Sequence, residues 1–178
     1  DDEGAARTAT EHLIELGHKR IGFIGGFKEY ALSQWRVDGW WSAMAAAGLP
    51  TEDLFVQGDF SFGSGDAATR QLLRLPERAT AIIGSNDQMT LAALDVAREF
   101  DLRVPDDLSL VSFDNTPIVR FTLPALTAVD QPIAATASRA VELIIDAQRG
   151  APLPTEPVVV PASLVRRQST GPVPARPS

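Results

Sequence analysis

Residues 81–115, AIIGSNDQMTLAALDVAREFDLRVPDDLSLVSFDN, carry the pattern that decides the fold. The stretch opens on a short apolar strand, expected at 80–85, continues as a helix over 87–100, and closes on a second apolar strand at 108–114. Short apolar strands on either side of a helix are typical of a β-α-β unit, in which the two strands are parallel. The polar pair Asn86-Asp87 lies where the first strand ends and the helix begins.

The same alternation continues on both sides of this unit. Further helices are expected at 3–16, 34–47, 64–74 and 132–149, and further strands at 20–26, 54–58, 126–131, 155–161 and 163–170. Strict alternation of helices with short apolar strands predicts an α/β fold, a doubly wound parallel sheet flanked by helices on both faces.

The composition describes one ordinary globular domain and narrows its function. The chain has 178 residues, of which 44% are hydrophobic and 22% charged, and its formal net charge is −7. Binding to nucleic-acid phosphates requires a basic face, so this chain is not expected to bind nucleic acid by itself. No apolar stretch approaches the roughly 20 residues that span a bilayer, so no membrane partner is expected.

The cysteine content and the first residues bear on the compartment. The chain has no cysteine and so cannot form disulfides, which fits a reducing cytoplasm. Residues 1–13, DDEGAARTATEHL, lack the basic and apolar regions of a signal peptide, so we expect a cytoplasmic protein. A chain that starts at Asp1 also fits a piece of a longer protein.

Polar and aromatic side chains follow the ends of several expected strands. In open α/β sheets, ligands bind outside the carboxyl ends of the strands. The candidates at this edge are Arg36, Phe60, Asn86, Asp114 and Gln131. Guanidinium, carboxylate and amide groups pair with hydroxyl groups, and an aromatic ring covers the apolar face of a sugar. The set therefore suits a small polyol.

Four of these residues also have a purely structural alternative. Either residue of the pair 86–87 could cap the helix that follows. The pair 114–115 could form a turn, and Arg36 could be a surface residue paired with Asp38. A single aromatic such as Phe60 is more often a core residue than a ligand platform. The shared position at strand ends is what favours binding.

Enzymatic interpretations have little support in the sequence. His12 and His18 are the only histidines, and neither has the neighbours that a metal site or a catalytic triad needs. The glycine-rich stretches at 22–26 and 63–65 complete neither a P-loop nor a dinucleotide-binding motif. We therefore expect no catalytic residue, no metal and no cofactor.

The helix at 87–100 has apolar residues on two sides. One side fits a stripe that faces the core and consists of Met89, Ala93, Val96 and Phe100. Leu91 and Leu94 lie on the opposite side, near Arg98. Single exposed leucines are common on soluble proteins, so this second side is either ordinary surface or a seam between two copies of the chain.

Several motifs, taken in order, resemble the effector-binding core of the LacI/GalR family of bacterial transcriptional repressors. They are ELGHKRIGFIGG at 15–26, RVDGWWSAMAAAGL at 36–49, AIIGSNDQMTLAALDVAREFDLRVPDDLSLVSFDNT at 81–116, LPALTAVDQP at 123–132 and LVRRQST at 164–170. The resemblance covers residues 3–170, and the ordered set is far more specific than any single motif.

The resemblance implies a set of roles for the candidate residues. Arg36 of RVDG is expected to be the effector-binding arginine, Asn86 to contact effector hydroxyls, and Asp114 to be the effector-binding carboxylate. Phe60 occupies the position of an aromatic that stacks on the ligand in relatives, and Gln131 lies where the chain crosses between lobes. No role carries over to Asn115. The family also implies a homodimer whose seam uses Leu91 and Leu94.

The resemblance also implies a division of the chain into parts. Family members have an N-terminal helix-turn-helix, a hinge helix and two periplasmic-binding-protein-like lobes with the effector between them. Residues 1–129 and 160–178 resemble the second lobe, and 130–159 resembles a crossover segment that belongs to the first lobe. The DNA-binding domain has no counterpart here, so operator DNA would be bound through an N-terminal domain. The helix expected at 132–149 has an apolar side that would then lack its partner.

The effector class is sugar or purine within this family. Phe60 and the absence of further basic residues near Arg36 favour a neutral sugar. The alternative function is a periplasmic sugar-binding protein of a transporter, which shares the fold and the cleft. A signal peptide upstream, in place of a helix-turn-helix, would distinguish it. An enzyme of doubly wound fold is a more distant alternative, which a turnover assay with candidate sugars would test.

Overall fold

Six strands form a single sheet in the computed structural model, which describes residues 1–173. Along the chain the strands are β1 Ile21–Gly25, β2 Phe55–Gln57, β3 Ala81–Gly84, β4 Ser109–Asp114, β5 Thr127–Asp130 and β6 Ser163–Val165. Their order across the sheet is β2-β1-β3-β4-β5-β6, and only the pairing of β5 with β6 is antiparallel among these strands. The predicted doubly wound parallel sheet is therefore confirmed, with one antiparallel pairing at its β6 edge.

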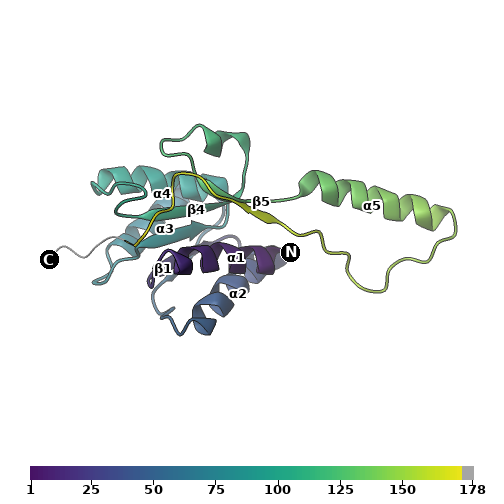
Figure 1. Cartoon of the computed structure of the whole chain (residues 1–178), viewed down its shortest axis with the longest axis horizontal. Coiled ribbons are helices and arrows are strands. Elements are labelled where there is room, and N and C mark those ends of the chain that lie inside the picture. Colours follow the sequence, from purple (N-terminus) through teal and green to yellow (C-terminus); the bar gives the residue numbers. More distant parts are fainter. Residues whose placement is uncertain (174–178) are drawn as a thin grey trace.

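The helices cover both faces of the sheet. They are α1 Asp2–Glu15, α2 Ala31–Ala46, α3 Phe62–Leu73, α4 Asp87–Glu99 and α5 Ile133–Gln148, with a short 3-10 helix, η1, at Pro117–Arg120. The pair α1 and α2 packs on one face and the pair α3 and α4 on the other, as Figure 1 shows. The chain reverses direction across the sheet between β1 and β3, which is the topological switch point of this fold.

Two glycines allow the helices of each pair to approach closely. A Cβ atom on Gly39 of α2 would lie 2.1 Å from the carbonyl oxygen of Glu3 on α1. A Cβ atom on Gly65 of α3 would lie 2.5 Å from the Cα of Met89 on α4. Real Cβ atoms do not make such contacts, so any other residue would push the helices apart. These glycines therefore set the spacing between the two helices of each pair.

The predicted core stripe of α4 is confirmed. Met89, Ala93 and Val96 are fully buried, and Phe100 is half-buried just past the helix end. The helix ends there because Asp101 adopts a left-handed backbone with φ of 55°, which breaks the repeat.

Three local predictions were wrong. Residues 155–161 are not a strand, because they have no neighbouring strand to pair with and the two prolines at 157 and 161 lack the N–H that pairing needs. The strand expected at 163–170 pairs only over Ser163–Val165. Helix α2 begins at Ala31, three residues earlier than expected, so Ser33 lies in the helix and not in a loop.

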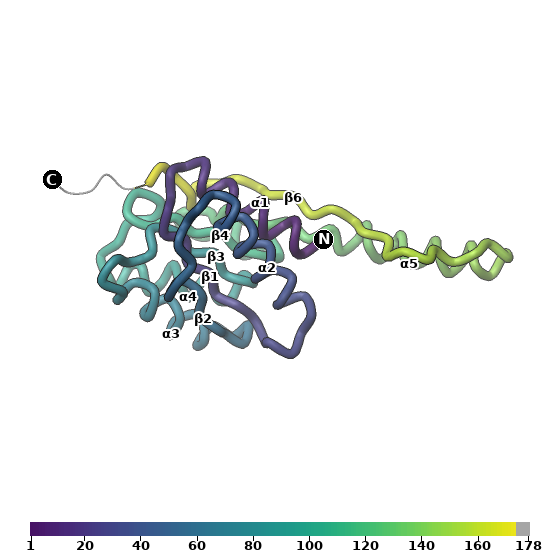
Figure 2. The backbone as a smooth tube through the Cα atoms, turned by 90° about the horizontal axis from the view of Figure 1, so that it is seen from below, coloured from purple at the N-terminus to yellow at the C-terminus, as the bar shows by residue number. Residues whose placement is uncertain are grey.

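Residues 131–162 form an arm that projects from the rest of the molecule, and the arm contains α5. Figures 1 and 2 show the arm extending away from the sheet and returning to it at β6. No residue of α5 is buried, and Ile133 and Ile144 are 71% and 59% exposed. The apolar side expected for this helix is therefore uncovered in the single chain. The assignment of 130–159 to another lobe stays a prediction, and 174–178 of the range assigned to the second lobe lie outside the described residues.

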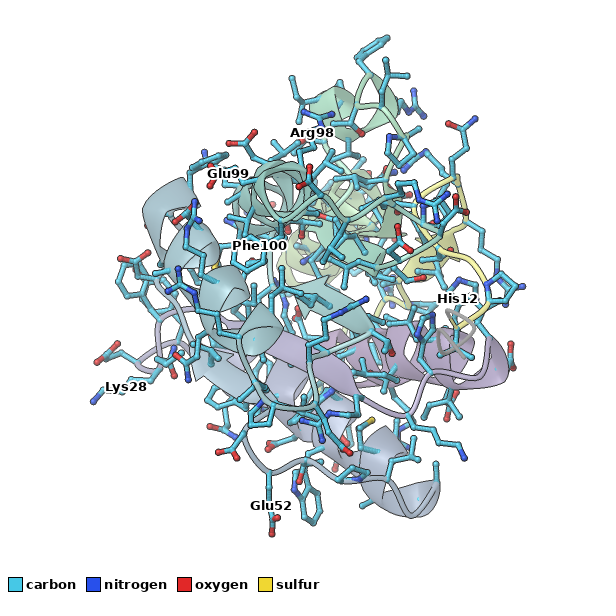
Figure 3. The ribbon with its side chains drawn as sticks, turned by 90° about the vertical axis from the view of Figure 1, so that its left-hand side faces the viewer. His12, Lys28, Glu52, Arg98, Glu99 and Phe100 are labelled. Carbon is cyan, nitrogen blue, oxygen red and sulfur yellow. The ribbon has the colours of Figure 1, made fainter. Side chains whose placement is uncertain are left out.

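The segment 168–173, named here the C-terminal clasp, runs back over the body of the molecule. Ser169 bonds to two strands, since its carbonyl accepts from the Leu110 N–H at 2.8 Å and its Oγ accepts from the Thr127 N–H at 2.8 Å. His12 of α1, labelled in Figure 3 beside this segment, contacts the Thr170 hydroxyl at 3.0 Å. The clasp thus ties β4, β5 and α1 together.

His18 is a core residue under this clasp. Its Nε2 lies 3.1 Å from the Gly171 carbonyl, which can only accept, so Nε2 carries the hydrogen, and its Nδ1 lies 2.9 Å from the Thr80 hydroxyl. Burial lowers the pKa of His18, which keeps the ring neutral.

No helix among residues 1–173 is long and apolar enough to cross a membrane.

Candidate functional site

The predicted ligand residues gather at the carboxyl edge of the sheet, around the switch point. Arg36 lies in the second turn of α2, which follows β1, and Asn86 lies two residues after β3, at the start of α4. Asp114 is the last residue of β4, and Gln131 follows β5. Loops that leave neighbouring strands in opposite directions open a crevice at such a point, and ligands of open α/β sheets bind there.

Arg36 is almost fully buried, with 4% of its surface exposed. Its guanidinium carbon lies 4.5 Å from the centre of the Phe113 ring, and its Nε donates to Asp2 at 2.7 Å. Nη1 donates to the carbonyl of Ser85. The alternative pairing with Asp38 is therefore wrong. Within the described residues Nη2 makes no hydrogen bond, so its two N–H groups remain for a ligand, besides the second N–H of Nη1.

Asp114 is held in an unusual backbone conformation close to Arg36 and Gln131. Its φ is 89°, and its Oδ1 accepts from Nε2 of Gln131 at 3.3 Å. Burial raises the pKa of the Asp114 carboxyl, the charge of Arg36 acts in the opposite direction, and the carboxylates of Asp87 and Asp2 raise it further. The structure therefore brings together Arg36, Asp114 and Gln131, as the sequence predicts.

Asn86 has two structural roles. Its Oδ1 accepts from the Met89 N–H at 2.9 Å and so caps α4, which confirms the capping alternative for this residue. Its Nδ2 donates to the carbonyl of Phe60 at 2.8 Å. Asn86 thus connects the start of α4 to the loop after β2, and its role towards a ligand stays a prediction.

Phe60 is half-buried and packs against the edge of the core. Its φ is 66°, and its ring covers Gly26, where a Cβ atom would overlap the ring. The half-exposed rings of Phe27 and Tyr30 stand 5.9 and 6.3 Å from the Phe60 ring, between centres. These three rings form an aromatic cluster beside the polar residues, which the sequence did not indicate beyond Phe60.

The crevice itself is open in the single chain. A pocket of about 460 Å³ is lined by Asn86 and Asp114, with Phe62, Asp87, Gln88, Leu91, Thr116 and Ile118. A hollow of about 20 Å³ lies between Asp2, Phe113 and Gln131. A larger pocket, about 580 Å³, is a shallow groove along α3 that contains none of the predicted ligand residues, so size alone does not indicate the site.

The backbone is strained at this edge. Phe60, Asp114 and Asn115 have φ values of 66°, 89° and 57°. Such conformations disfavour side chains with a Cβ atom and cost about 1–3 kcal/mol each, so they persist where the surrounding contacts enforce them. Three of the five non-glycine residues with positive φ in the described chain lie at this one edge. This clustering is typical of functional sites.

Leu91 and Leu94 differ in exposure. Leu94 is only 4% exposed, because the segment after η1 lies over it, and Leu91 is half-buried. Arg98, labelled in Figure 3, donates to the carbonyl of Leu123 at 2.9 Å and so holds the segment after η1 against α4. Four large apolar side chains near Leu91 are exposed, namely Phe62, Ile118, Phe121 and Leu123.

The chain matches a known protein family. The model of the periplasmic binding protein-like domain matches residues 10–170. The chain belongs to that family. Within the periplasmic binding protein-like family, the relatives of this chain are LacI/GalR-type regulators, so the resemblance seen in the motifs is confirmed.

Three known proteins show the degree of similarity. The HTH-type transcriptional repressor CytR of Escherichia coli strain K12 is 36% identical over 98% of this chain and 51% of its own length. A solved structure of a transcriptional regulator CelR–cellobiose complex is 38% identical, with a TM-score of 0.85, over 95% of this chain and 52% of that one. A dimeric Lac repressor structure is 29% identical, with a TM-score of 0.90, over 98% and 63%.

The chain spans about half the length of the curated relatives it matches. These relatives are repressors and regulators, which agrees with the expectation that this member of the family is not an enzyme.

Proposed function

We propose that this chain is the ligand-sensing part of a LacI/GalR-like DNA-binding transcriptional regulator. The observation that carries the proposal is the convergence of Arg36, Asp114 and Gln131 at the switch point of the sheet, with Nη2 of Arg36 unoccupied by the described residues. A buried guanidinium donor beside a carboxylate suits an uncharged ligand rich in hydroxyl groups. The similarity to CytR and CelR supports a regulator.

The effector is a small neutral sugar under this proposal. Asp114 and Asp2 would repel an anionic ligand, and Arg36 already neutralises one of them. The aromatic cluster of Phe27, Tyr30 and Phe60 offers flat apolar faces beside the polar groups, as sugar rings require. The CelR complex with cellobiose, in which the bound molecule is a sugar, supports this class.

The exposed arm supports the proposed division into lobes. In this proposal 130–159 packs on a first lobe formed by another part of the same protein, and the effector binds in the cleft between the lobes. A helix with Ile133 and Ile144 exposed by more than half has apolar surface to bury. The crevice described above then forms one wall of the cleft.

The exposed apolar surface around Leu91 supports a homodimer. Phe121 and Leu123 are each 80% exposed, which is unusual for side chains of this size. Leu94 is already buried in the single chain, so in this proposal Leu91 and its exposed neighbours make the contact and Leu94 supports them. A two-fold operator requires a two-fold protein, and the similar Lac repressor structure is dimeric.

One experiment separates the regulator from the transport protein. The protein that contains this chain, in its natural length, is mixed with DNA from upstream of its own gene, with and without glucose, galactose, ribose or cellobiose, and DNA binding is measured by fluorescence anisotropy. A regulator binds the DNA and a sugar changes the affinity. A protein that binds a sugar but no DNA would be the periplasmic binding protein instead. The 178-residue chain alone, with its net charge of −7, should not bind the DNA at moderate salt.

A further inference from the structure

Asp87 is a buried carboxylate that holds the segment carrying Asp114. It is the first residue of α4 and is 4% exposed. Its Oδ1 accepts from the Ser112 hydroxyl at 2.5 Å. Its Oδ2 accepts from the N–H and from the hydroxyl of Thr116, at 2.7 and 2.6 Å. All three hydrogen bonds therefore come from β4 and the loop that follows it.

The positions of these donors are informative. Ser112 and Thr116 flank Asp114 and Asn115, the two consecutive residues with positive φ. Two such residues in a row are unfavourable in a free loop, at about 1–3 kcal/mol each. The Asp87 carboxylate accepts hydrogen bonds from residues on both sides of the pair 114–115, and so fixes the backbone before and after it. The direction of the Asp114 side chain depends on that backbone.

The surroundings of Asp87 stabilise its negative charge and hold its side chain in one position. The N-terminus of α4 favours a negative charge at its first residue. Both carboxylate oxygens are already engaged, so the group is poorly placed to bind a ligand directly. We propose that Asp87 is a positioning residue for effector binding, which fixes the Asp114 loop without touching the effector. This inference rests on the proposed function.

The same loop is also fixed by the hydrogen bonds of Asn115, which do not involve α4. Nδ2 of Asn115 donates to Asp130 at 2.7 Å, and its Oδ1 accepts from Arg167 at 2.6 Å. These contacts join the loop to β5 and to the segment that follows β6. They do not involve Asp87. A change at Asp87 should therefore release one side of the loop while the fold and the Asn115 contacts remain.

The test compares variants of matched shape in the protein of natural length. Asp87→Asn keeps the volume but turns an N–H group towards the donors of Thr116. Thr116→Val removes one hydroxyl, and Thr116→Ser restores it. Asp101→Asn is the control, because Asp101 is exposed and keeps its left-handed backbone as asparagine. Calorimetry with the sugar, among glucose, galactose, ribose and cellobiose, that binds the unaltered protein gives the affinity.

We expect Asp87→Asn to weaken sugar binding about tenfold or more, and Thr116→Val to weaken it less, because hydrogen bonds to charged groups contribute about 1.5–3 kcal/mol. Thr116→Ser and the control should stay within about twofold, which is near the error of one such comparison. Hydrogen exchange of the Thr116 amide should accelerate in Asp87→Asn. Unchanged affinity in Asp87→Asn would overturn the inference, whatever the exchange rate.

The pKa of Asp114 is a second measurement, which would not change if Asp87 only stabilised the fold. Burial raises its pKa, Arg36 lowers it, Asp87 and Asp2 raise it, and the Gln131 hydrogen bond lowers it. Removing the charge of Asp87 should therefore lower the pKa of Asp114, measured by carbon NMR of the carboxyl group. If no sugar of the panel binds the unaltered protein, the proposed sugar effector fails. Exchange at Thr116 then decides the inference, since unchanged exchange in Asp87→Asn overturns it and faster exchange supports it.

Discussion

Replacing Arg36 by methionine should weaken both sugar binding and the fold. Methionine keeps the length of the side chain and part of its contact with Phe113, but it removes every donor. The carboxylate of Asp2, whose side chain is 22% exposed, loses its partner, and the buried carbonyl of Ser85 loses a hydrogen bond. Unpaired groups of this kind cost about 1–3 kcal/mol each, so the free energy of unfolding should fall by about 2–4 kcal/mol.

The comparison variant is Asp114→Asn, which separates binding from stability. The hydrogen bond recorded for the Asp114 side chain is a long one, 3.3 Å from Gln131, so the change should alter stability little. Loss of one charged partner should still weaken sugar binding about tenfold or more. Urea unfolding and calorimetry on the protein of natural length measure the two effects. Undiminished stability in Arg36→Met would refute the argument from unpaired polar groups, and undiminished affinity in both variants would refute the site.

Three further predictions concern the interface, the acid behaviour and the arm. Leu91→Lys should give monomers in sedimentation, whereas Glu11→Lys on the exposed side of α1 should not; a dimer that survives Leu91→Lys excludes the proposed seam. The pKa of Asp114 is raised, so sugar affinity should fall as the pH drops through that pKa, at a higher pH than for an ordinary aspartate. The raised pKa also contributes to the stability of the fold. This contribution is fully present below pH 3.8, the ordinary pKa of an aspartate, and is lost as the pH rises through the raised pKa of Asp114. Urea unfolding of Asp114→Asn and of the unaltered protein at several pH values measures it. In the isolated 178-residue chain, amides of Ile133–Gln148 should exchange rapidly, and strong protection in a proven monomer would contradict the lobe assignment.

Local patterns predicted the sheet well because each strand and helix buries its own face. The alternation in residues 81–115 is enough to indicate a β-α-β unit, and the stripe of α4 follows from helical periodicity alone. The same reasoning fails at 155–161, where an apolar run has no neighbouring strand. It also fails at Leu94, whose side of the helix is covered by a segment about 25 residues further along the chain.

The positions of the candidate residues in the fold were predictable, but their contacts were not. The rule that ligands bind at strand ends selected Arg36, Asp114 and Gln131, which the structure brings together. The partner of Arg36 is Asp2, 34 positions away, and no local pattern links the two. For the pair 86–87, sequence reasoning left open which residue caps α4. Asn86 is the cap, and Asp87 reaches instead to a strand that only the fold places beside it.

The C-terminal clasp affects the order in which this molecule can fold during synthesis. The main-chain groups of Leu110 and Thr127 find partners in Ser169, and the ring of His18 finds one in Gly171. All of these partners are translated after the arm. When residues up to 160 have emerged from the ribosome, the chain can form the four parallel strand pairings, but β4 and β5 still lack these bonds. The arm must leave the ribosome before the body can close, so the segment that we assign to another lobe is available for docking while the body is still incomplete.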